Sequence, residues 1–361
     1  MYREGASTIR YTSGAFLNPE ARQSRDVSVA YLKAHASKDS LVLDATAATG
    51  IRGIRYCLEA GTGKVGFLEM NEKAAASMRK NIALNKVKPY VIGKSVQEFA
   101  NTTNDRFDFI DLDPFGGVTP YIYDLMKISG NGTRLMATAT DTAVLCGADQ
   151  PACIRLYDAR PMHNELCHEA GLRILAGYIA RTAAQFNFGI EAELSFSYMH
   201  YMRVFIRLSH GNGAAMRSVR SMGYAHHCSA CLYTGTERSM LPKRTECPEC
   251  GKGMDVSGRM WLGAINSKDE ASKIHDNIGE SEERSRSLIE SIIGEADAPM
   301  YYSIPRITKK LKIGAVSPVS TVASLRSNGF NASLTHMEKN AVKTDATIKD
   351  VISAVRKARR P

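Results

Sequence analysis

The chain has 361 residues, of which 44% are hydrophobic, and a formal net charge of +10. This length can hold two domains, and the composition allows a sizeable core. No run of about 18 apolar residues occurs and residues 1–14 lack an apolar signal core, so we expect a cytoplasmic protein that does not cross a membrane.

The first 210 residues alternate short apolar runs with helical patterns. Strands are predicted at residues 40–45, 64–70, 89–93, 106–113 and 134–140, helices at 50–61, 71–85 and 163–186, and a closing hairpin of strands at 189–198 and 201–209. Strand–helix alternation of this kind predicts an α/β fold with a mostly parallel sheet flanked by helices. Ligands of such sheets bind at the carboxyl ends of the strands.

The composition changes near residue 212. The stretch HGNGAAM (210–216) is rich in Gly and Ala and is predicted to be a linker. A Cys-rich module, a polar helix (267–296) and a helix–turn–helix–strand pattern (301–336) follow, the last suggesting a small winged-helix-like fold. We therefore place a domain boundary between residues 212 and 213.

The positive charge is concentrated at the C-terminal end. Residues 298–361 contain twelve Lys and Arg against three Asp and Glu, which leaves a net charge of about +1 for the rest. A basic region on a nearly neutral body indicates a polyanionic partner, most often nucleic acid. The alternative is a solvated face that aids solubility. The basic side chains expected to meet phosphates are Lys309, Lys310, Lys312, Arg356, Lys357, Arg359 and Arg360.

Two predicted strands end in acids. Asp44 opens the turn DATAATG, whose small residues let the backbone approach a ligand closely, and Glu69 ends the next strand. A carboxylate at that spacing can accept both hydroxyls of a ribose. Because the turn has no phosphate-cradling glycine motif and no lysine, the pattern favours S-adenosylmethionine over a dinucleotide. The alternative is an ordinary strand–helix turn with a solvated acid.

The fourth strand runs into DLDPFGG, residues 111–117. Asp113 and the carbonyl of Pro114 can accept hydrogen bonds from an exocyclic amine, and Phe115 can stack on the base that carries it. Such a base must leave any duplex. The alternative is a helix start with Asp113 as the cap and Pro114 in the first turn. Asp141 is assigned either to this base pocket or to a turn cap.

The cysteines fall into two groups. Two CxxC pairs, CSAC and CPEC, are separated by 15 residues and match a tetrahedral structural zinc site. Two disulfides are the alternative, which a reducing compartment disfavours. The neighbouring His226 and His227 are expected to be exposed loop residues. The predicted zinc ligands are Cys228, Cys231, Cys247 and Cys250. The remaining cysteines, expected to be reduced core thiols, are Cys57, Cys146, Cys153 and Cys167.

Several motifs in order resemble the tRNA (guanine-26) dimethyltransferase family. The four strongest are LDATAATGIRGIRY (43–56), IDLDPFGG (110–117), TATDTAVLCG (138–147) and ELCHEAGLRIL (165–175). AFLNPEARQSRDVSV (15–29) resembles the N-terminal motif of that family, and MWLGAI, around Trp261, resembles one in its C-terminal domain.

The resemblance covers the chain up to about residue 265 and implies a Rossmann-like, S-adenosylmethionine-dependent methyltransferase fold. Together with the composition change, the CxxC pairs and the basic end, it leads us to expect a methyltransferase domain at residues 1–212 and a smaller zinc- and tRNA-binding α+β domain at 213–361. It implies two successive methylations of the 2-amino group of guanosine 26 in tRNA. We expect the protein to be a monomer. An amino-methyltransferase acting on adenine or ribosomal guanine is the first alternative. A non-catalytic RNA-binding protein is the second.

The resemblance also assigns roles in the cofactor site. Arg25 would meet the methionine carboxylate with Arg52 nearby, Asp44 would lie under the methionine, and Glu69, usually aspartate in the family, would take the ribose hydroxyls. Where the family commonly offers an acid near the adenine, this chain has Ser95 and Val96, so we expect weaker or main-chain contacts there.

In the substrate site, the resemblance makes Asp113 the acceptor for the 2-amino group, which it helps to deprotonate. Phe16 and Phe115 would sandwich the guanine. This chain has Gly117 where the family often has serine, and we expect little effect because the backbone must turn there.

Overall fold

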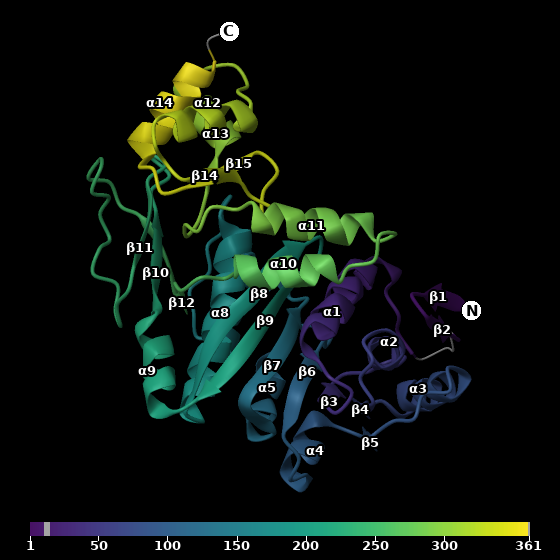
Figure 1. The fold of residues 1–361 in the computed structure, drawn as a ribbon. Helices are drawn as coiled ribbons and strands as arrows, with labels where there is room; N and C mark the ends of the chain where they lie inside the picture. Colours follow the sequence, from purple (N-terminus) through teal and green to yellow (C-terminus); the bar gives the residue numbers. More distant parts are fainter. Residues whose placement is uncertain (11–14, 360–361) are drawn as a thin grey trace.

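The computed structural model describes residues 1–10 and 15–359, so Arg360, one of the predicted phosphate contacts, lies outside the described residues. A seven-stranded sheet forms the centre of the protein (Figure 1), with five parallel strands and a hairpin whose β9 runs antiparallel to both neighbours. The order across the sheet is β5 (Val91–Gly93), β4 (Lys64–Leu68), β3 (Leu41–Asp44), β6 (Phe107–Leu112), β7 (Ser129–Ala139), β9 (Tyr201–His210) and β8 (Phe188–Tyr198). The predicted mostly parallel sheet is confirmed.

Helices cover both faces of this sheet, because successive side chains of a buried strand point to opposite sides. In β6, for example, Phe109 and Ile110 belong to two different hydrophobic cores. One face is covered by α4 (Val96–Thr102), α5 (Thr119–Lys127) and α8 (Cys167–Gln185). The other is covered by α1 (Arg22–His35), α2 (Ile51–Glu59) and α3 (Glu72–Leu84).

Short elements complete the first part of the chain. A hairpin and a 3-10 turn precede α1, and two short helices lie between β7 and α8. They are β1 (Tyr2–Glu4), β2 (Ser7–Ile9), η1 (Pro19–Ala21), α6 (Thr142–Leu145) and α7 (Gln150–Tyr157). No helix in the described ranges is long and apolar enough to span a membrane.

The linker predicted at residues 210–216 is wrong, because most of it belongs to α9 (Asn212–Arg220). This helix packs on β8: the backbone N–H of Ile190 donates to Ser218 Oγ at 2.8 Å. A Cβ at Gly189 would lie 2.4 Å from the carbonyl oxygen of Ala214, so the glycine permits the close approach. Packing of one helix face outweighs the weak helix propensity of the Gly- and Ala-rich sequence.

The Cys-rich module is a three-stranded antiparallel sheet of β10 (Met222–His227), β11 (Thr234–Glu237) and β12 (Asp255–Trp261). It packs on α8, where Gly177 leaves room for the backbone of β12: an added Cβ would lie 2.9 Å from the nitrogen of Trp261. Met222 and Trp261 are part of the same hydrophobic core as α8.

The polar helix predicted at residues 267–296 is two helices, α10 (Lys268–Asp276) and α11 (Glu283–Ile293). A turn around Gly279 lets them lie antiparallel across α1 (Figure 1), where Ala271, Ile274 and Ile289 enter the second core of the main sheet. A single straight helix could not bury both of these apolar stripes against α1.

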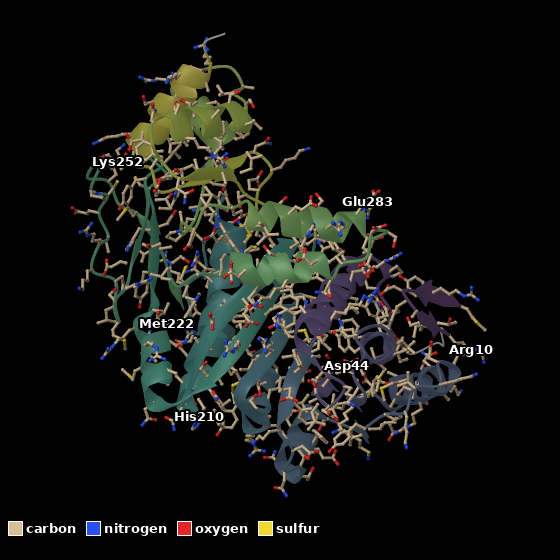
Figure 2. The ribbon with its side chains drawn as sticks, viewed as in Figure 1. Arg10, Asp44, His210, Met222, Lys252 and Glu283 are labelled. Atoms are coloured by element: carbon tan, nitrogen blue, oxygen red, sulfur yellow. The ribbon has the colours of Figure 1, made fainter. Side chains whose placement is uncertain are left out.

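Residues 302–358, here named the C-terminal unit, form most of a third hydrophobic core, which Leu232 of the Cys-rich module completes. The helix–helix–strand order predicted for its first part is confirmed; the winged-helix-like fold stays a prediction. Its elements are β13 (Tyr302–Ser303), α12 (Ile304–Leu311), α13 (Pro318–Ser327), β14 (Ala332–Leu334), β15 (Ala341–Thr344) and α14 (Ile348–Ala358). Figure 2 shows Lys252, in the Cys-rich module, close to this unit, and Lys349 Nζ lies 2.7 Å from Glu249 Oε2.

Buried charges attach the C-terminal unit to α8 and to the segment that follows α11. Lys343 Nζ lies 3.0 Å from Glu169 Oε2 in α8 and 3.3 Å from Glu295 Oε2. All three side chains are at most 5% exposed. The cores are shared across the chain: Met337 and Ala341 of the C-terminal unit belong to the core of α8, and Leu232 of the Cys-rich module belongs to the core of the C-terminal unit. The boundary at 212/213 stays a prediction.

Candidate active site

A cleft of about 570 Å³ opens at the carboxyl ends of β3, β4 and β6. Nearly all of the predicted site residues line it. These are Phe16, Arg25, Arg52, Glu69, Ser95, Val96, Asp113, Pro114 and Phe115. The exception is Asp44, which lies beneath the cleft floor and is 1% exposed.

The turn after β3 forms this floor. Its backbone is fixed to both neighbouring strands, since Ala45 N donates to the carbonyl of Asp111 and Ala47 N to that of Leu68, both at 2.8 Å. Asp44 Oδ2 accepts the N–H of Gly53 in α2 at 3.0 Å. Burial, and then the nearby Asp111 carboxylate, raise the pKa of Asp44 to about 7. Asp44 therefore holds the start of α2 against the cleft and titrates near neutrality.

Glu69 stands directly after β4 and is oriented by two backbone N–H groups. Its Oε2 accepts from Ala48 at 2.8 Å and its Oε1 from Asn71 at 2.7 Å. A carboxylate oxygen has about two acceptor positions, so each oxygen can still accept a hydroxyl from the cleft. This geometry fits the vicinal hydroxyls of a ribose.

Asp113 follows β6 and faces the cleft from a fixed position. Its backbone N–H donates to Thr46 Oγ1 at 2.9 Å, and Arg52 Nε donates to its Oδ2 at 2.9 Å. Burial raises the pKa of Asp113, but the charges of Arg52 and Arg203 and the hydrogen bond from Arg52 together outweigh burial and hold the pKa below the usual value. The side chain is 25% exposed, so an ionised acceptor faces the cleft. The helix-cap alternative for Asp113 is wrong, because α5 begins only at Thr119.

A buried network that local sequence pattern does not indicate lies under Asp113. Arg203 Nη2 donates to Asp111 Oδ1 at 3.0 Å and Oδ2 at 2.9 Å, and the hydroxyl of Tyr56 donates to the same carboxylate. Arg52 Nη1 lies 3.6 Å from Asp111 Oδ2 and also bonds Ser28 Oγ at 3.4 Å. The network fixes the Arg52 guanidinium that holds Asp113.

Phe16 and Phe115 stand at the cleft mouth, 55% and 73% exposed. Their ring centroids are 4.7 Å apart with an interplanar angle of 66°, an edge-to-face contact. The turn that carries Phe115 is fixed to the end of β7, since Gly116 N donates to Thr140 Oγ1 at 2.7 Å. A planar ring can enter between the two phenylalanines only if they move apart, and Phe16 lies on a segment outside helices and strands.

The remaining predicted residues form the walls. Arg25 Nε and Nη2 bond both carboxylate oxygens of Glu4, at 2.6 and 2.5 Å, and its Nη1 donates to the carbonyl of Asn18 at 3.1 Å. Ser95 caps α4 by accepting the N–H of Glu98 at 3.1 Å, and Val96 is buried at the base of the cleft. Only the Nη1 edge of Arg25 points away from Glu4.

The sequence family described as N2,N2-dimethylguanosine tRNA methyltransferase matches residues 2–356. The chain belongs to this family. It is 34% identical to the tRNA (guanine(26)-N(2))-dimethyltransferase of Methanothermobacter thermautotrophicus, over 96% of each chain, and 33% identical to that of Pyrococcus abyssi, over 97% of this chain and 94% of the other. The solved complex of Trm1 from Pyrococcus horikoshii with S-adenosyl-L-methionine superposes with a TM-score of 0.91 at 30% identity, covering 98% and 99% of the two chains. The predicted family and fold class are confirmed.

Asp141 lies beside the turn at Gly117, and three more residues line the cleft. Asp141 stands at the N-cap of α6, but its carboxylate accepts the hydroxyl of Tyr157 at 2.9 Å and makes no side-chain cap bond; its part in the base pocket stays a prediction. Tyr201, at the start of β9, and the preceding His200 also line the cleft. Thr46 is a cleft residue that sequence reasoning missed, although it lies in the turn DATAATG.

The four cysteines of the two CxxC pairs come together at one end of the β10–β12 sheet. Cys228 Sγ lies 3.6 Å from Cys250 Sγ, and Cys231 Sγ lies 3.4 Å from Cys247 Sγ. Ligands around a tetrahedral zinc with Zn–S bonds of about 2.3 Å are roughly 3.8 Å apart. Leu232 N donates to the carbonyl of Cys228 at 2.7 Å and Gly251 N to that of Cys247 at 2.9 Å, which forms the tight turns of two knuckles. The donor set and its spacing fit zinc.

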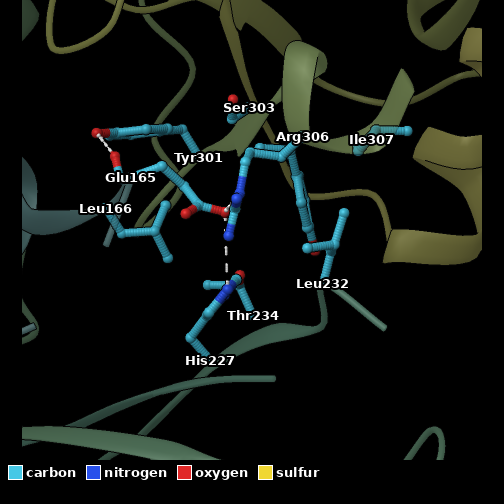
Figure 3. A pocket seen from close by; sticks show the side chains of 10 residues that line it. Glu165, Leu166, His227, Leu232, Thr234, Tyr301, Ser303, Arg306 and Ile307 are labelled. Atoms are coloured by element: carbon cyan, nitrogen blue, oxygen red, sulfur yellow. Dashed lines mark hydrogen bonds and ion pairs between the residues drawn. The ribbon is translucent and has the colours of Figure 1, made fainter. Parts of the chain in front are cut away.

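The prediction that His226 and His227 are exposed is wrong, since both are 3% exposed in β10. Figure 3 shows His227 beneath Glu165 and Arg306 at the junction with the C-terminal unit. His227 Nε2 lies 3.7 Å and Arg306 Nε 3.2 Å from Glu165 Oε1. Burial lowers the pKa of His227. Its ring faces Glu165 at the junction, and in the described part of the chain it is not grouped with the four cysteines.

Proposed function

We propose that the protein transfers two methyl groups from S-adenosylmethionine to the exocyclic 2-amino group of guanosine 26 in tRNA. The observation that carries the proposal is the arrangement of one cleft. Glu69, a ribose acceptor, lies on its floor, and the ionised acceptor Asp113 lies beside an aromatic pair at its mouth. The relatives that share this chain's length bear the name of the same reaction.

The cofactor site would use residues at three strand ends. Glu69 would accept the two ribose hydroxyls, and the carbonyl and amide groups around Ser95 and Val96 would contact the adenine. The methionine end would lie over the turn that Asp44 supports. Arg25 would reach the carboxylate through Nη1, because Glu4 occupies its other edge. When bound, the cofactor supplies a methyl group on a positively charged sulfur.

Asp113 would orient the target amine. An N–H of the guanine donates to its carboxylate and a second can donate to the carbonyl of Pro114, which directs the nitrogen lone pair into the cleft. After one methyl transfer the amine still has an N–H for Asp113, so the same contact serves both rounds. Because Arg52 helps to hold the pKa of Asp113 low, the carboxylate is a weak base before transfer, and its main contribution is orientation and stabilisation of the positive charge that develops on the amine. As the nitrogen–methyl bond forms and the sulfur–methyl bond breaks, the nitrogen becomes a strong acid, and its proton passes to Asp113 and from there to solvent.

Phe16 and Phe115 would separate and enclose the guanine. Stacking on an aromatic side chain contributes about 1–3 kcal/mol per base, which helps to offset the loss of stacking within the tRNA. The edge-to-face contact closes the slot until the base arrives.

The Cys-rich module would hold a structural zinc through Cys228, Cys231, Cys247 and Cys250, since four thiolates complete the tetrahedral shell. The basic C-terminal unit would bind tRNA phosphates. We retain the division into a methyltransferase domain (1–212) and a zinc- and tRNA-binding domain (213–361), a monomeric state and a cytoplasmic location as parts of the proposal.

The test is incubation of the full chain with labelled S-adenosylmethionine and an unmodified tRNA transcript, followed by nucleoside analysis. We expect N2-methylguanosine first and N2,N2-dimethylguanosine later. A transcript with adenosine at position 26 is the matched control and should take up no label. Label in adenosine, or transfer to ribosomal RNA but not to tRNA, would favour the alternative amino-methyltransferases.

A further inference from the structure

Two thiols and an imidazole meet at a place that neither the catalytic cleft nor the Cys-rich module uses. One ligand atom each of Cys146, Cys167 and His168 lies within 4.8 Å of the others. All three residues are partly buried, between the accessible surface and the core. None of them lines the cleft. The sequence-based interpretation of Cys146 and Cys167 as inert core thiols does not account for the histidine beside them.

The backbone fixes these donors in place. Cys146 ends α6, while Cys167 and His168 are the first two residues of α8. The two helices touch closely, because a Cβ at Gly171 would lie 3.2 Å from the Cβ of Leu145. The positive end of the 19-residue α8 favours the thiolate form of Cys167.

The loop before α8 also packs against the end of α6. Gly147 has φ +85°, and an added Cβ would lie 3.0 Å from the carbonyl of Met162. His163 Nδ1 lies 3.1 Å from the carbonyl oxygen of Cys146. The donors are therefore held by packed backbone on both sides and do not depend on a mobile loop for their approach.

Two thiolates and one imidazole are the donor set of a zinc-class cation. Ligands of such a cation lie roughly 3.4–3.8 Å apart, given metal–sulfur bonds of about 2.3 Å and metal–nitrogen bonds of about 2.0 Å. Donors already within 4.8 Å reach this spacing through small rotations of their side chains. A disulfide between Cys146 and Cys167 would involve only the two sulfurs and would not explain why the His168 imidazole lies beside them.

We propose that Cys146, Cys167 and His168 form a second metal site, which binds a zinc-class divalent cation with three protein ligands and leaves a fourth position for water. Binding displaces the two thiol protons. The metal would join the end of α6 to the start of α8. Because Thr140, just before α6, holds the turn of Phe115, the metal would also brace the mouth of the cleft.

The test is metal stoichiometry of the full chain, purified with reductant and reconstituted with Co2+ or Zn2+. We expect the wild type to bind one equivalent more than Cys146→Ser or Cys167→Ser, and His168→Gln to weaken the second equivalent at least tenfold. Cys153→Ser is the matched control: this buried thiol lies in the same region but outside the cluster, and the variant should keep the wild-type stoichiometry. With cobalt, loss of the site should remove about a third of the thiolate charge-transfer absorption, two of six sulfur ligands.

Equal stoichiometry in the wild type and both cysteine variants would overturn the proposal. So would a Cys146–Cys167 disulfide that peptide mapping finds in the reduced preparation. If the four-cysteine module failed to bind metal, wild type and variants would all bind one equivalent fewer, and the difference of one would remain. If a cysteine variant failed to fold, His168→Gln, which keeps both thiols, would decide: an unchanged affinity for every bound equivalent in this variant would overturn the proposal.

Discussion

Replacing Asp44 with asparagine tests the electrostatics under the cleft. The pKa of Asp44 is raised from 3.8 to about 7, chiefly by burial. For a raised pKa, the contribution of the group to stability is full below pH 3.8 and is lost as the pH rises through about 7. At 1.36 kcal/mol per pKa unit, the native state is penalised by about 1.6 kcal/mol at pH 5 and by about 4 kcal/mol at pH 9.

The D44N variant stays neutral at every pH and can still accept the N–H of Gly53 through its side-chain oxygen. We therefore expect the free energy of unfolding of D44N to exceed that of the wild type by an amount that grows by roughly 2–3 kcal/mol between pH 5 and pH 9. The comparison between two pH values cancels any constant effect of the amide on packing.

The assay is urea unfolding of the cofactor-free protein at pH 5, 7 and 9. Asp39→Asn, at an exposed position, is the matched control and should change stability by less than about 0.5 kcal/mol at each pH. A stability difference between D44N and wild type that is the same at pH 5 and pH 9 would refute the reasoning. It would mean that ionisation of the Asp44 carboxyl costs the folded state no free energy.

Three other outcomes are expected. Asp113→Asn should lower methyl transfer at least 100-fold while the cofactor Kd, measured by calorimetry, changes less than twofold; unchanged turnover would contradict its role. Glu69→Ala should raise that Kd at least tenfold, since removal of a charge-assisted hydrogen bond costs about 1.5–3 kcal/mol; a change below twofold would speak against it. Arg356→Ala and Lys357→Ala should make the salt dependence of tRNA binding shallower by about 0.7–0.9 for each phosphate that the side chain neutralises, with cofactor affinity unchanged; equal slopes would place the RNA elsewhere. Substitution is preferred to truncation because Val355 is fully buried.

The elements and the position of the cleft follow from local pattern. Acids such as Asp44, Glu69 and Asp113 end neighbouring parallel strands, and this geometry brings strand ends to one edge of a sheet. Local pattern does not predict which side chains pair when they are far apart in the sequence. Arg203 is 92 residues from its partner Asp111, and Arg25 bonds Glu4 across 21 residues. Periodicity identifies which face of an element is buried but not the side chain opposite it.

Local pattern also fails where packing decides the structure. The stretch HGNGAAM forms α9 because β8 and α8 cover one side of it. Asp113 does not cap a helix, because its carboxylate pairs with Arg52 and the chain turns toward β7 before α5 begins. Both wrong predictions assumed the structure that is commonest for the local sequence. In each case a contact with an element far along the chain stabilises a different structure.

The buried charges around Lys343 also bear on how one nucleotide is chosen. Lys343, Glu169 and Glu295 join the basic C-terminal unit to α8 without solvent between them, so the span from that unit to the mouth of the cleft is fixed. If the C-terminal unit binds tRNA phosphates, only a guanosine at one fixed distance from those phosphates in the folded tRNA would reach Asp113. Position 26 would then be selected by distance, and the bases that surround it could vary freely from one tRNA to the next.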